Sequence, residues 1–304
     1  MSKQISQKLI NISLFIFLVL IYTHSSLSFN GASRGLYVWY TALVPVLLPV
    51  MIILRLIYTY SSKKNIWSLI FFSSLAGIPT SSKITSDLFG AGHLDEKRYR
   101  FLIILTANPS LSFLTSYIIL MINKNHSISG FMLAFPIVTV LISSFITATI
   151  HKALNINKDY NHKSHIKYKE EPTIVTTNDF DDIILSCVIT ILKILGFIVL
   201  FSTLCELLLI FGDSLVFIII RSSLEISCGV LILLENVTDK VLFYCLINTL
   251  CSFGGICGIF QIISTLPKDS HISFIFLLKY KMLNAIIAFS ISYIIMLLIN
   301  QYHL

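Results

Sequence analysis

Long apolar runs alternate with short polar segments along the chain, and most runs are long enough for a membrane-spanning helix. A bilayer core of about 30 Å is crossed by about 20 apolar residues in a helix. The pattern predicts about seven spanning helices. They are Leu9–Tyr22, Leu36–Tyr58, Phe101–Ile122, Gly130–Ile150, Ile183–Ile210, Ser214–Glu235 and Ile272–Asn300. A cleaved signal peptide is the alternative for the first, short run, but no small-x-small cleavage site follows it convincingly.

Two further apolar segments are interrupted. Ile66–Ile78 stops at Pro79, and Val241–Leu266 is broken in its middle by Gly254-Gly255. Interrupted hydrophobic segments are tolerated in a membrane only where protein or a water-filled cavity buries the broken backbone. We therefore predict two re-entrant or broken-helix hairpins, one near 66–90 and one near 241–266.

The composition agrees with a membrane protein. Apolar residues make up 56% of the chain and charged residues 12%, whereas soluble chains carry about 25% charged residues. This excludes a soluble enzyme, a disordered chain and a disulfide-stapled secreted scaffold. The net charge of +7 does not indicate a nucleic-acid partner, because the lysines and arginines lie mostly between apolar runs. The expected partner is the lipid bilayer.

Basic residues decide how the first interrupted segment is placed. If it returns to its own side, only Arg34 and Lys124 of the loop residues considered lie outside, and the lysines of 151–180 face the cytoplasm. If it crosses, those lysines move to the exterior. The positive-inside rule therefore favours the hairpin. We expect a multi-pass protein of the cell membrane with a cytoplasmic N-terminus.

The two interrupted segments resemble each other at an offset of 178 residues, with seven identities between 74–93 and 252–271. The identities pair Ser74, Gly77, Ile78, Ile84, Ser86, Leu88 and His93 with Ser252, Gly255, Ile256, Ile262, Ser264, Leu266 and His271. We therefore predict two related membrane halves, 1–150 and 182–304, joined by a polar cytoplasmic loop at 151–181. The predicted fold is an all-α polytopic membrane protein.

The first hairpin has the composition of an anion site. A half-helix that starts inside a membrane exposes unpaired N–H groups and the positive end of its dipole. Pro79 suits its first turn, and a full positive charge follows at Lys83. The residues expected to bind substrate here are Gly77, Pro79, Thr80, Ser81, Ser82 and Lys83. A tight turn at the cytoplasmic surface, with Lys83 in water, is the alternative.

Other polar residues at membrane depth are candidates for the substrate path. Asn108 stands beside Pro109, which frees a backbone carbonyl one turn earlier, although a plain kink would explain the pair. Glu225 lies in an apolar run, where a charge is costly unless paired or wet. Lys193 could pair with Glu225 or snorkel. In the second interrupted segment the candidates are Gly254, Gly255 and Gln261.

Nothing in the chain predicts a cofactor, a metal or an enzyme. The six cysteines lie in apolar stretches without a C-x-x-C pair, which favours small buried hydrophobes. The His162-Lys163-Ser164-His165 run has no carboxylate or thiolate partner at ligand spacing. There is no ATP-binding G-x-x-x-x-G-K-[ST] loop and no catalytic pair on one helical face.

The run Leu75-Ala76-Gly77-Ile78-Pro79-Thr80-Ser81-Ser82-Lys83-Ile84-Thr85-Ser86-Asp87-Leu88 resembles the signature of YlbJ-type sporulation integral membrane proteins, which carry the nucleoside-recognition Gate domain. Ala107-Asn108-Pro109, the 223–229 stretch and the 252–256 stretch with Gln261 are similar to it as well. The resemblance implies a role in endospore formation, with passage of the planar dicarboxylate dipicolinate across the membrane around the forespore. It leaves open a homo-oligomer or an assembly with other sporulation membrane proteins.

These observations together predict a transporter or permease for a small, anionic metabolite. Two alternatives stay open. One is a non-transporting structural or assembly protein of the spore envelope, and the other is a nucleoside-type permease. Substitutions in the hairpins discriminate the first alternative, because a structural protein would tolerate them.

Overall fold

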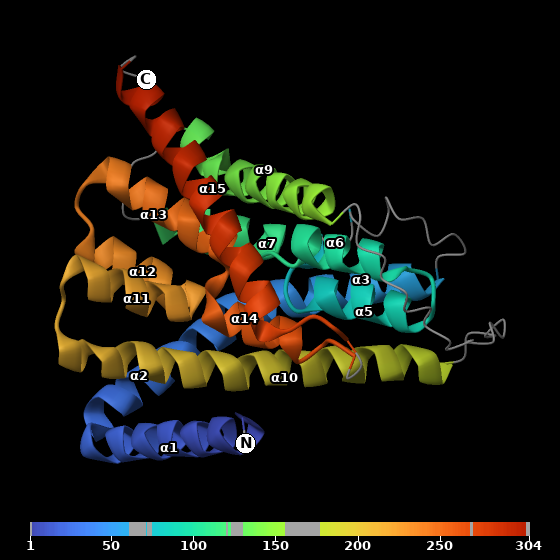
Figure 1. Cartoon of the computed structure of the whole chain (residues 1–304), viewed down its shortest axis with the longest axis horizontal. Helices are drawn as coiled ribbons and strands as arrows, with labels where there is room; N and C mark the ends of the chain where they lie inside the picture. Colours follow the sequence, from blue (N-terminus) through green and yellow to red (C-terminus); the bar gives the residue numbers. More distant parts are fainter. Residues whose placement is uncertain are drawn as a thin grey trace.

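The computed structural model describes residues 2–60, 71, 75–119, 121–122, 130–155, 177–267 and 270–301. Within these residues every regular element is helical, which confirms the predicted all-α class (Figure 1). The elements of the first half are α1 (Ser2–Thr23), α2 (Ser25–Val38), η1 (Trp39–Leu43), α3 (Val44–Tyr60), α5 (Thr80–Gly90), α6 (Glu96–Thr106), α7 (Leu111–Phe113), η2 (Leu114–Ile119) and α9 (Gly130–Leu154). Those of the second half are α10 (Thr177–Leu207), η3 (Leu208–Phe211), α11 (Leu215–Leu224), α12 (Ile226–Asn236), α13 (Lys240–Phe253), α14 (Gly255–Ile263) and α15 (Phe274–Gln301).

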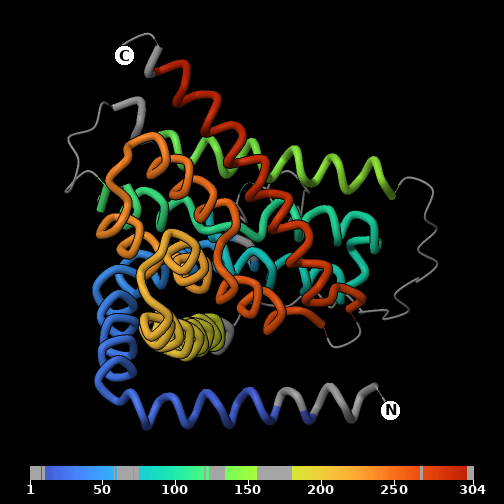
Figure 2. Tube along the Cα trace, turned by 60° about the vertical axis from the view of Figure 1, so that its left-hand side comes forward, coloured from blue at the N-terminus to red at the C-terminus, as the bar shows by residue number. Residues whose placement is uncertain are grey.

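Six helical stretches of the described chain are long and apolar enough to cross a membrane. They are Ser25–Ile57, Glu96–Ile119, Ala134–Leu154, Phe180–Phe211, Lys240–Ile263 and Phe274–Ile299. The apolar part of α1, Asn11–Thr23, is shorter. This helix lies along the outside of the bundle and joins it through α2 (Figure 2). The predicted polytopic membrane protein is thus confirmed, with six such stretches where the sequence predicted about seven.

The helices form two units with the same order of elements. Each has a long helix, a hairpin, a helix broken in its middle and a second long helix. The first unit runs from α2 through α9, and the second runs from α10 through α15. The hairpins approach from opposite ends of the bundle, since α5 extends toward the right in Figure 1 and α11 and α12 toward the left. The two units therefore have opposite orientations along the long axis.

Only part of the first predicted hairpin, 66–90, lies within the described residues. α3 ends and α6 begins at the right-hand end of the bundle in Figure 1, whereas the turn before α5 lies in its interior. The described chain therefore leaves α3 and enters α6 at the same end of the bundle. The turn consists of Gly77, with a φ of 64°, and the cis Ile78-Pro79 bond. Most of the first arm falls outside the described residues.

The structure places the second hairpin at 215–236 and not at 241–266. Instead of the single span predicted for Ser214–Glu235, α11 and α12 fold back on each other at Glu225. Their arms are in tight contact, because a Cβ on Gly229 would lie 2.3 Å from the Ser222 carbonyl oxygen. The predicted hairpin at 241–266 is instead the broken span α13–α14.

This difference also changes the correspondence between the halves. The offset of 178 residues pairs Gly77 with Gly255, but Gly77 lies at a hairpin tip and Gly255 in a broken span. The order of elements pairs the tip at 77–79 with the tip at 224–226. The seven sequence identities therefore do not occupy equivalent places in the two units.

Local chemistry explains where the broken helices start and stop. Asp95 caps α6 by accepting from the Arg98 N–H, and Asp239 caps α13 by accepting from the Leu242 N–H, both at 2.7 Å. α6 ends before Pro109, which has no N–H to continue the helix. α13 ends at Gly254, which has a φ of 78°. One or two residues thus determine where each helix is interrupted.

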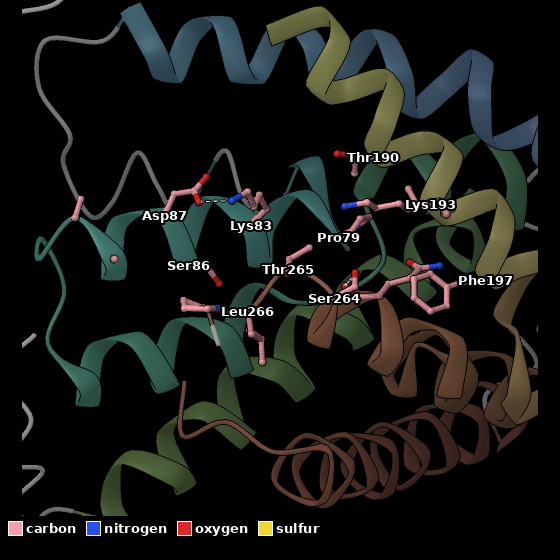
Figure 3. A pocket seen from close by; sticks show the side chains of 15 residues that line it. Pro79, Lys83, Ser86, Asp87, Thr190, Lys193, Phe197, Ser264, Thr265 and Leu266 are labelled. Carbon is pink, nitrogen blue, oxygen red and sulfur yellow. Dashed lines mark hydrogen bonds and ion pairs between the residues drawn. The ribbon is translucent and has the colours of Figure 1, made fainter. Parts of the chain in front are cut away.

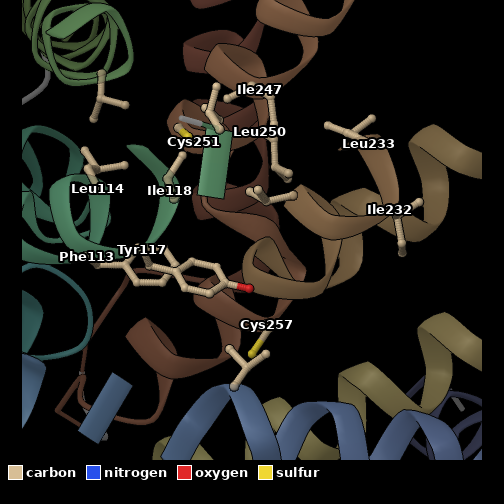
Figure 4. Packing of buried hydrophobic residues seen from close by; sticks show 14 of the residues in the cluster. Phe113, Leu114, Tyr117, Ile118, Ile232, Leu233, Ile247, Leu250, Cys251 and Cys257 are labelled. Carbon is tan, nitrogen blue, oxygen red and sulfur yellow. The ribbon is translucent and has the colours of Figure 1, made fainter. Parts of the chain in front are cut away.

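Apolar side chains from both units fill the interior. Phe113, Tyr117 and Ile118 from α7 and η2 pack with Leu250 and Cys251 of α13 in one buried cluster (Figure 4). All six cysteines are buried and free, as the sequence predicts. The core therefore joins the two broken helices and fixes how their breaks are positioned.

Candidate functional site

Four interruptions of the helices meet in the interior of the bundle. They are the hairpin tips at 77–79 and 224–226 and the helix breaks at 107–110 and 253–255, and we call this meeting point the centre. In the first unit the Ile78 N–H donates to the Asn108 carbonyl at 2.9 Å. In the second, a Cβ on Gly255 would lie 3.3 Å from the Leu224 carbonyl oxygen and the Ile226 nitrogen. Each hairpin tip thus packs on the break of its own unit.

The two units also meet each other at the centre. A Cβ on Gly254 would lie 3.7 Å from Ile78 Cδ1 and 3.9 Å from Pro109 Cδ. A Cβ on Gly258, one turn later in α14, would lie 3.5 Å from Ile78 Cδ1. Small residues on α14 therefore let the tip of the first hairpin reach the break of the second unit.

The half-helices that start at the centre differ in how their N-termini are capped. Ser110 caps α7 by accepting from the Phe113 N–H, and Glu225 caps α12 by accepting from the Ser227 and Cys228 N–H groups. No side chain caps α5 or α14. The buried hydroxyls of Thr80 and Ser81 at the start of α5 have no hydrogen-bond partner in the described part of the chain. Two half-helices at the centre thus start without a side-chain cap, and the start of α5 carries two buried hydroxyls without a described partner.

Glu225 and Asn108 line the centre, but their polar atoms bond to the protein itself. Both carboxylate oxygens of Glu225 hold N–H groups of α12, at 3.0 and 2.8 Å. The Asn108 amide donates to the Leu105 carbonyl at 2.8 Å, which is the carbonyl that Pro109 leaves free. These two residues stabilise the hairpin tip and the helix break, which is a different role from the direct path-lining that the sequence suggests.

Two cavities adjoin the centre. The smaller, of about 50 Å³, lies among the tips and breaks and includes Glu225, Gly254 and Gln261 in its lining. This is room for one or two water molecules. The larger, of about 620 Å³, lies between α5, α10 and the end of α14, and we call it the vestibule. Ile194 and Gln261 line both cavities, so they separate the vestibule from the centre.

The vestibule is lined by two lysines and one aspartate. Lys83 and Asp87 form an ion pair within α5, and Lys193 extends from α10 into the same space (Figure 3). No carboxylate lies within 4.0 Å of Lys193 among the described residues. Pro79, at the tip of the first hairpin, lines the vestibule as well. The vestibule thus has an excess of positive charge and leads to the start of α5.

The structure brings the predicted site residues together. Gly77, Pro79, Thr80, Ser81 and Ser82 form the first tip and the start of α5. Lys83 lies in the vestibule, and Asn108, Glu225, Gly254 and Gly255 surround the centre. Gln261 separates the two cavities, and its amide donates to Cys257 Sγ at 3.3 Å. Within the described residues no group of three or more metal-ligating side chains occurs.

The sequence analysis missed one buried charge beside the centre. Lys281 of α15 is 6% exposed and donates to the Ala107 carbonyl and to Asn108 Oδ1. Its Nζ would lie 3.7 Å from a Cβ on Gly254. A lysine within an apolar run is the signal that could have found it, because an ionisable residue at membrane depth is costly.

Comparison with protein families, with curated proteins and with solved structures finds no match to any of them. The fold itself defines the class. This is an all-α polytopic membrane protein with two units of opposite orientation, whose four interrupted segments meet at one centre.

The meeting of the two units can be tested by cross-linking. In a background without the native cysteines, Ile78→Cys and Gly258→Cys should react with a short bifunctional reagent, because their side chains face each other across the centre. A control pair of Ile78→Cys with Gly212→Cys, at the end of η3, should not react. Equal yields from both pairs would contradict the arrangement.

Proposed function

We propose that this protein is a transporter for a small anionic metabolite and works by alternating access. The observation that carries the proposal is the meeting of two hairpin tips and two helix breaks, from units of opposite orientation, around one centre. Broken backbone at membrane depth is tolerated where it lines a cavity, and transporter sites are typically formed by such discontinuous helices. No step of the proposal needs a catalytic group or a cofactor.

The charges of the two ends support a cytoplasmic vestibule. α6 begins and α9 ends at the right-hand end of the bundle in Figure 1, where α5 also ends, and these two helix ends carry Lys97 and Lys152. The connections from η3 to α11 and from α12 to α13 lie at the left-hand end, and Asp213, Glu235 and Asp239 belong to them or to the adjoining turn. The positive-inside rule puts the basic end in the cytoplasm. We therefore propose that the vestibule opens toward the cytoplasm, with the N-terminus on the same side.

Three features favour an anion as the substrate. The vestibule carries two lysines against one aspartate, and the uncapped start of α5 presents the positive end of a helix dipole. The Thr80 and Ser81 hydroxyls add neutral donors. A planar dicarboxylate such as dipicolinate fits this chemistry. Together with the resemblance to sporulation membrane proteins, this fit supports a proposed role in endospore formation, at the cell membrane or the membrane around the forespore.

In the proposed cycle the anion enters the vestibule, binds at the start of α5 and then passes the Ile194–Gln261 constriction into the centre. Movement of one unit against the other then opens the centre toward the opposite side. The contacts of Ile78 with α14 would break and re-form during this movement. The energy comes from a gradient or from trapping on the far side, because the chain has no ATP-binding loop.

Reconstituted protein tests the proposal through uptake of labelled dipicolinate, with other dicarboxylates and nucleosides as competitors. Saturable uptake that dicarboxylates inhibit would support it. The nucleoside-type alternative predicts inhibition by nucleosides instead. An absence of uptake of either class, by protein that is folded and correctly inserted, would contradict the proposal.

The two vestibule lysines give a second prediction. Lys83→Ala and Lys193→Ala should each raise the KM for the anion, by about 5-fold to 10-fold, because each removes a positive charge from the anion's path. The effect should shrink at high ionic strength. Stability should change little, because Lys83 is partly exposed in an ion pair of a kind that contributes below about 1 kcal/mol. Lys152→Ala is the matched control at the same end of the bundle, and an equal effect there would contradict a specific role for the vestibule.

A further inference from the structure

Lys281 is a buried cation whose bonding partners in the described chain are oxygen atoms of neutral groups. Its ammonium donates to the Ala107 backbone carbonyl and to Asn108 Oδ1, the latter at 3.1 Å. No carboxylate lies within 4.0 Å of it among the described residues, and the side chain is 6% exposed. A buried charge without a counter-ion is costly, so its position calls for an explanation.

The oxygen atoms around Lys281 belong to the end of a half-helix. Ala107 is the C-cap of α6, where carbonyl groups lack partners within the helix and the dipole is negative. The Asn108 side chain is fixed by its bond to the Leu105 carbonyl, so its Oδ1 faces the ammonium. Carbonyl oxygens at the C-terminal end of a broken membrane helix are ligands of the kind that hold a monovalent metal ion.

We propose that the Lys281 ammonium is a tethered cation that occupies a monovalent-cation site at the α6 break. It occupies the carbonyl end of α6, so the wild-type protein does not bind Na⁺ or Li⁺ there. Removing the side chain vacates the site and makes it available to a free cation. The site itself follows from the geometry, whereas a consequence for the driving ion rests on the proposed transport function.

The position of Lys281 also connects the two units. α15 belongs to the second unit, and the Ala107 and Asn108 oxygens belong to the first. Asn284, one turn after Lys281, donates to the Ser252 carbonyl of α13 at 2.8 Å and accepts from Thr147 of α9. α15 is therefore hydrogen-bonded both to α13 of the second unit and to α9 of the first. The ammonium stays in register with the α6 break as long as the units keep this arrangement.

A thermal-stability experiment with simple salts tests the site without any substrate. Purified wild-type protein, Lys281→Ala and Lys279→Ala are melted in NaCl, LiCl, KCl or choline chloride at equal ionic strength. Lys279 is the matched control, because it lies on the same helix and is exposed. Wild type and Lys279→Ala should melt at the same temperature in all four salts. Lys281→Ala should melt lower in choline and recover by several degrees, saturably, in Na⁺ or Li⁺.

The size of this recovery follows from linkage. A site half-saturated at about 10 mM would favour the folded protein about 10-fold at 100 mM salt. A specific Na⁺ shift in the wild type, or no cation-specific shift in Lys281→Ala, would overturn the proposal.

Lys281→Gln covers the case in which the alanine variant does not survive extraction. The amide keeps hydrogen-bond donors for the two oxygens but carries no charge. It should fold, and its uptake should fall at least 10-fold, while wild-type uptake is equal in Na⁺ and choline. Wild-type uptake rates in Lys281→Gln would overturn the need for a cation. If the wild type shows no uptake at all, the transport proposal fails and the salt-dependent melting still decides whether the cation site exists.

Discussion

Gly77→Ala is expected to abolish transport and to lower the melting temperature of the protein more than any other single methyl addition. Gly77 has a φ of 64°, a conformation that alanine adopts only at a cost. A Cβ there would lie 2.2 Å from the Ser110 nitrogen and 2.4 Å from the Ser110 Cα. These are backbone atoms, so no side-chain rotation relieves the collision. The expected loss of stability is about 3 kcal/mol or more.

Gly196→Ala is the matched control for this change. Gly196 lies in α10 with no heavy atom within 4 Å of an added Cβ, and alanine favours a helix by about 1 kcal/mol over glycine. Uptake should be unchanged and the melting temperature equal or slightly higher. If Gly77→Ala behaves like Gly196→Ala in uptake and in thermal melting, the packing of the first tip on the α6 break is wrong.

Glu225→Ala is expected to have the second largest effect, through the tip of the second hairpin. The carboxylate is buried at 2% exposure and accepts from the N–H groups of Ser227 and Cys228. Its removal leaves two buried donors without partners and the start of α12 without its cap. Losing a cap costs about 1 kcal/mol, and each orphaned buried donor costs about 1 to 3 kcal/mol. Uptake should fall by at least 10-fold, because the tip forms part of the centre.

Two further variants separate the cap from a general effect of lost charge. Glu225→Gln keeps one accepting oxygen, so its stability and uptake should fall between those of the wild type and Glu225→Ala. Asp95→Ala removes the cap of α6 from a side chain that is 62% exposed, so it should cost about 1 kcal/mol and leave uptake intact. The expected order of stability is wild type, then Glu225→Gln, then Glu225→Ala. It would be contradicted if Glu225→Ala melted at the wild-type temperature in the same detergent.

The first hairpin could be predicted because its signals are local and its placement follows from charge. Pro79 ends the apolar run early, and the lysines of the later loop require that the segment does not cross. The same reasoning fails for the second hairpin. The run Ser214–Glu235 has span length and no Gly or Pro at its turn, so nothing in its pattern indicates a reversal.

The reversal at Glu225 depends on a side chain replacing the usual turn residues. The Glu225 carboxylate holds the first N–H groups of α12, which permits a sharp change of direction in an apolar run. Conversely, Gly254 and Gly255 interrupt α13–α14 without reversing the chain, although glycines are the usual mark of a turn. A break and a reversal therefore look alike in sequence, because both need only residues that leave the helical conformation.

By itself, the sequence determined that this is an all-α membrane protein, that its first hairpin turns at Gly77–Pro79 and that its cysteines are buried. These properties depend on the apolar content of segments and on the conformations of single residues. Only the tertiary structure decided that four interruptions meet, that Glu225 is a cap and that Lys281 bonds to a carbonyl 174 residues away. In the last two contacts the partner of the side chain is a backbone group, which every residue carries alike, so the sequence does not reveal that partner.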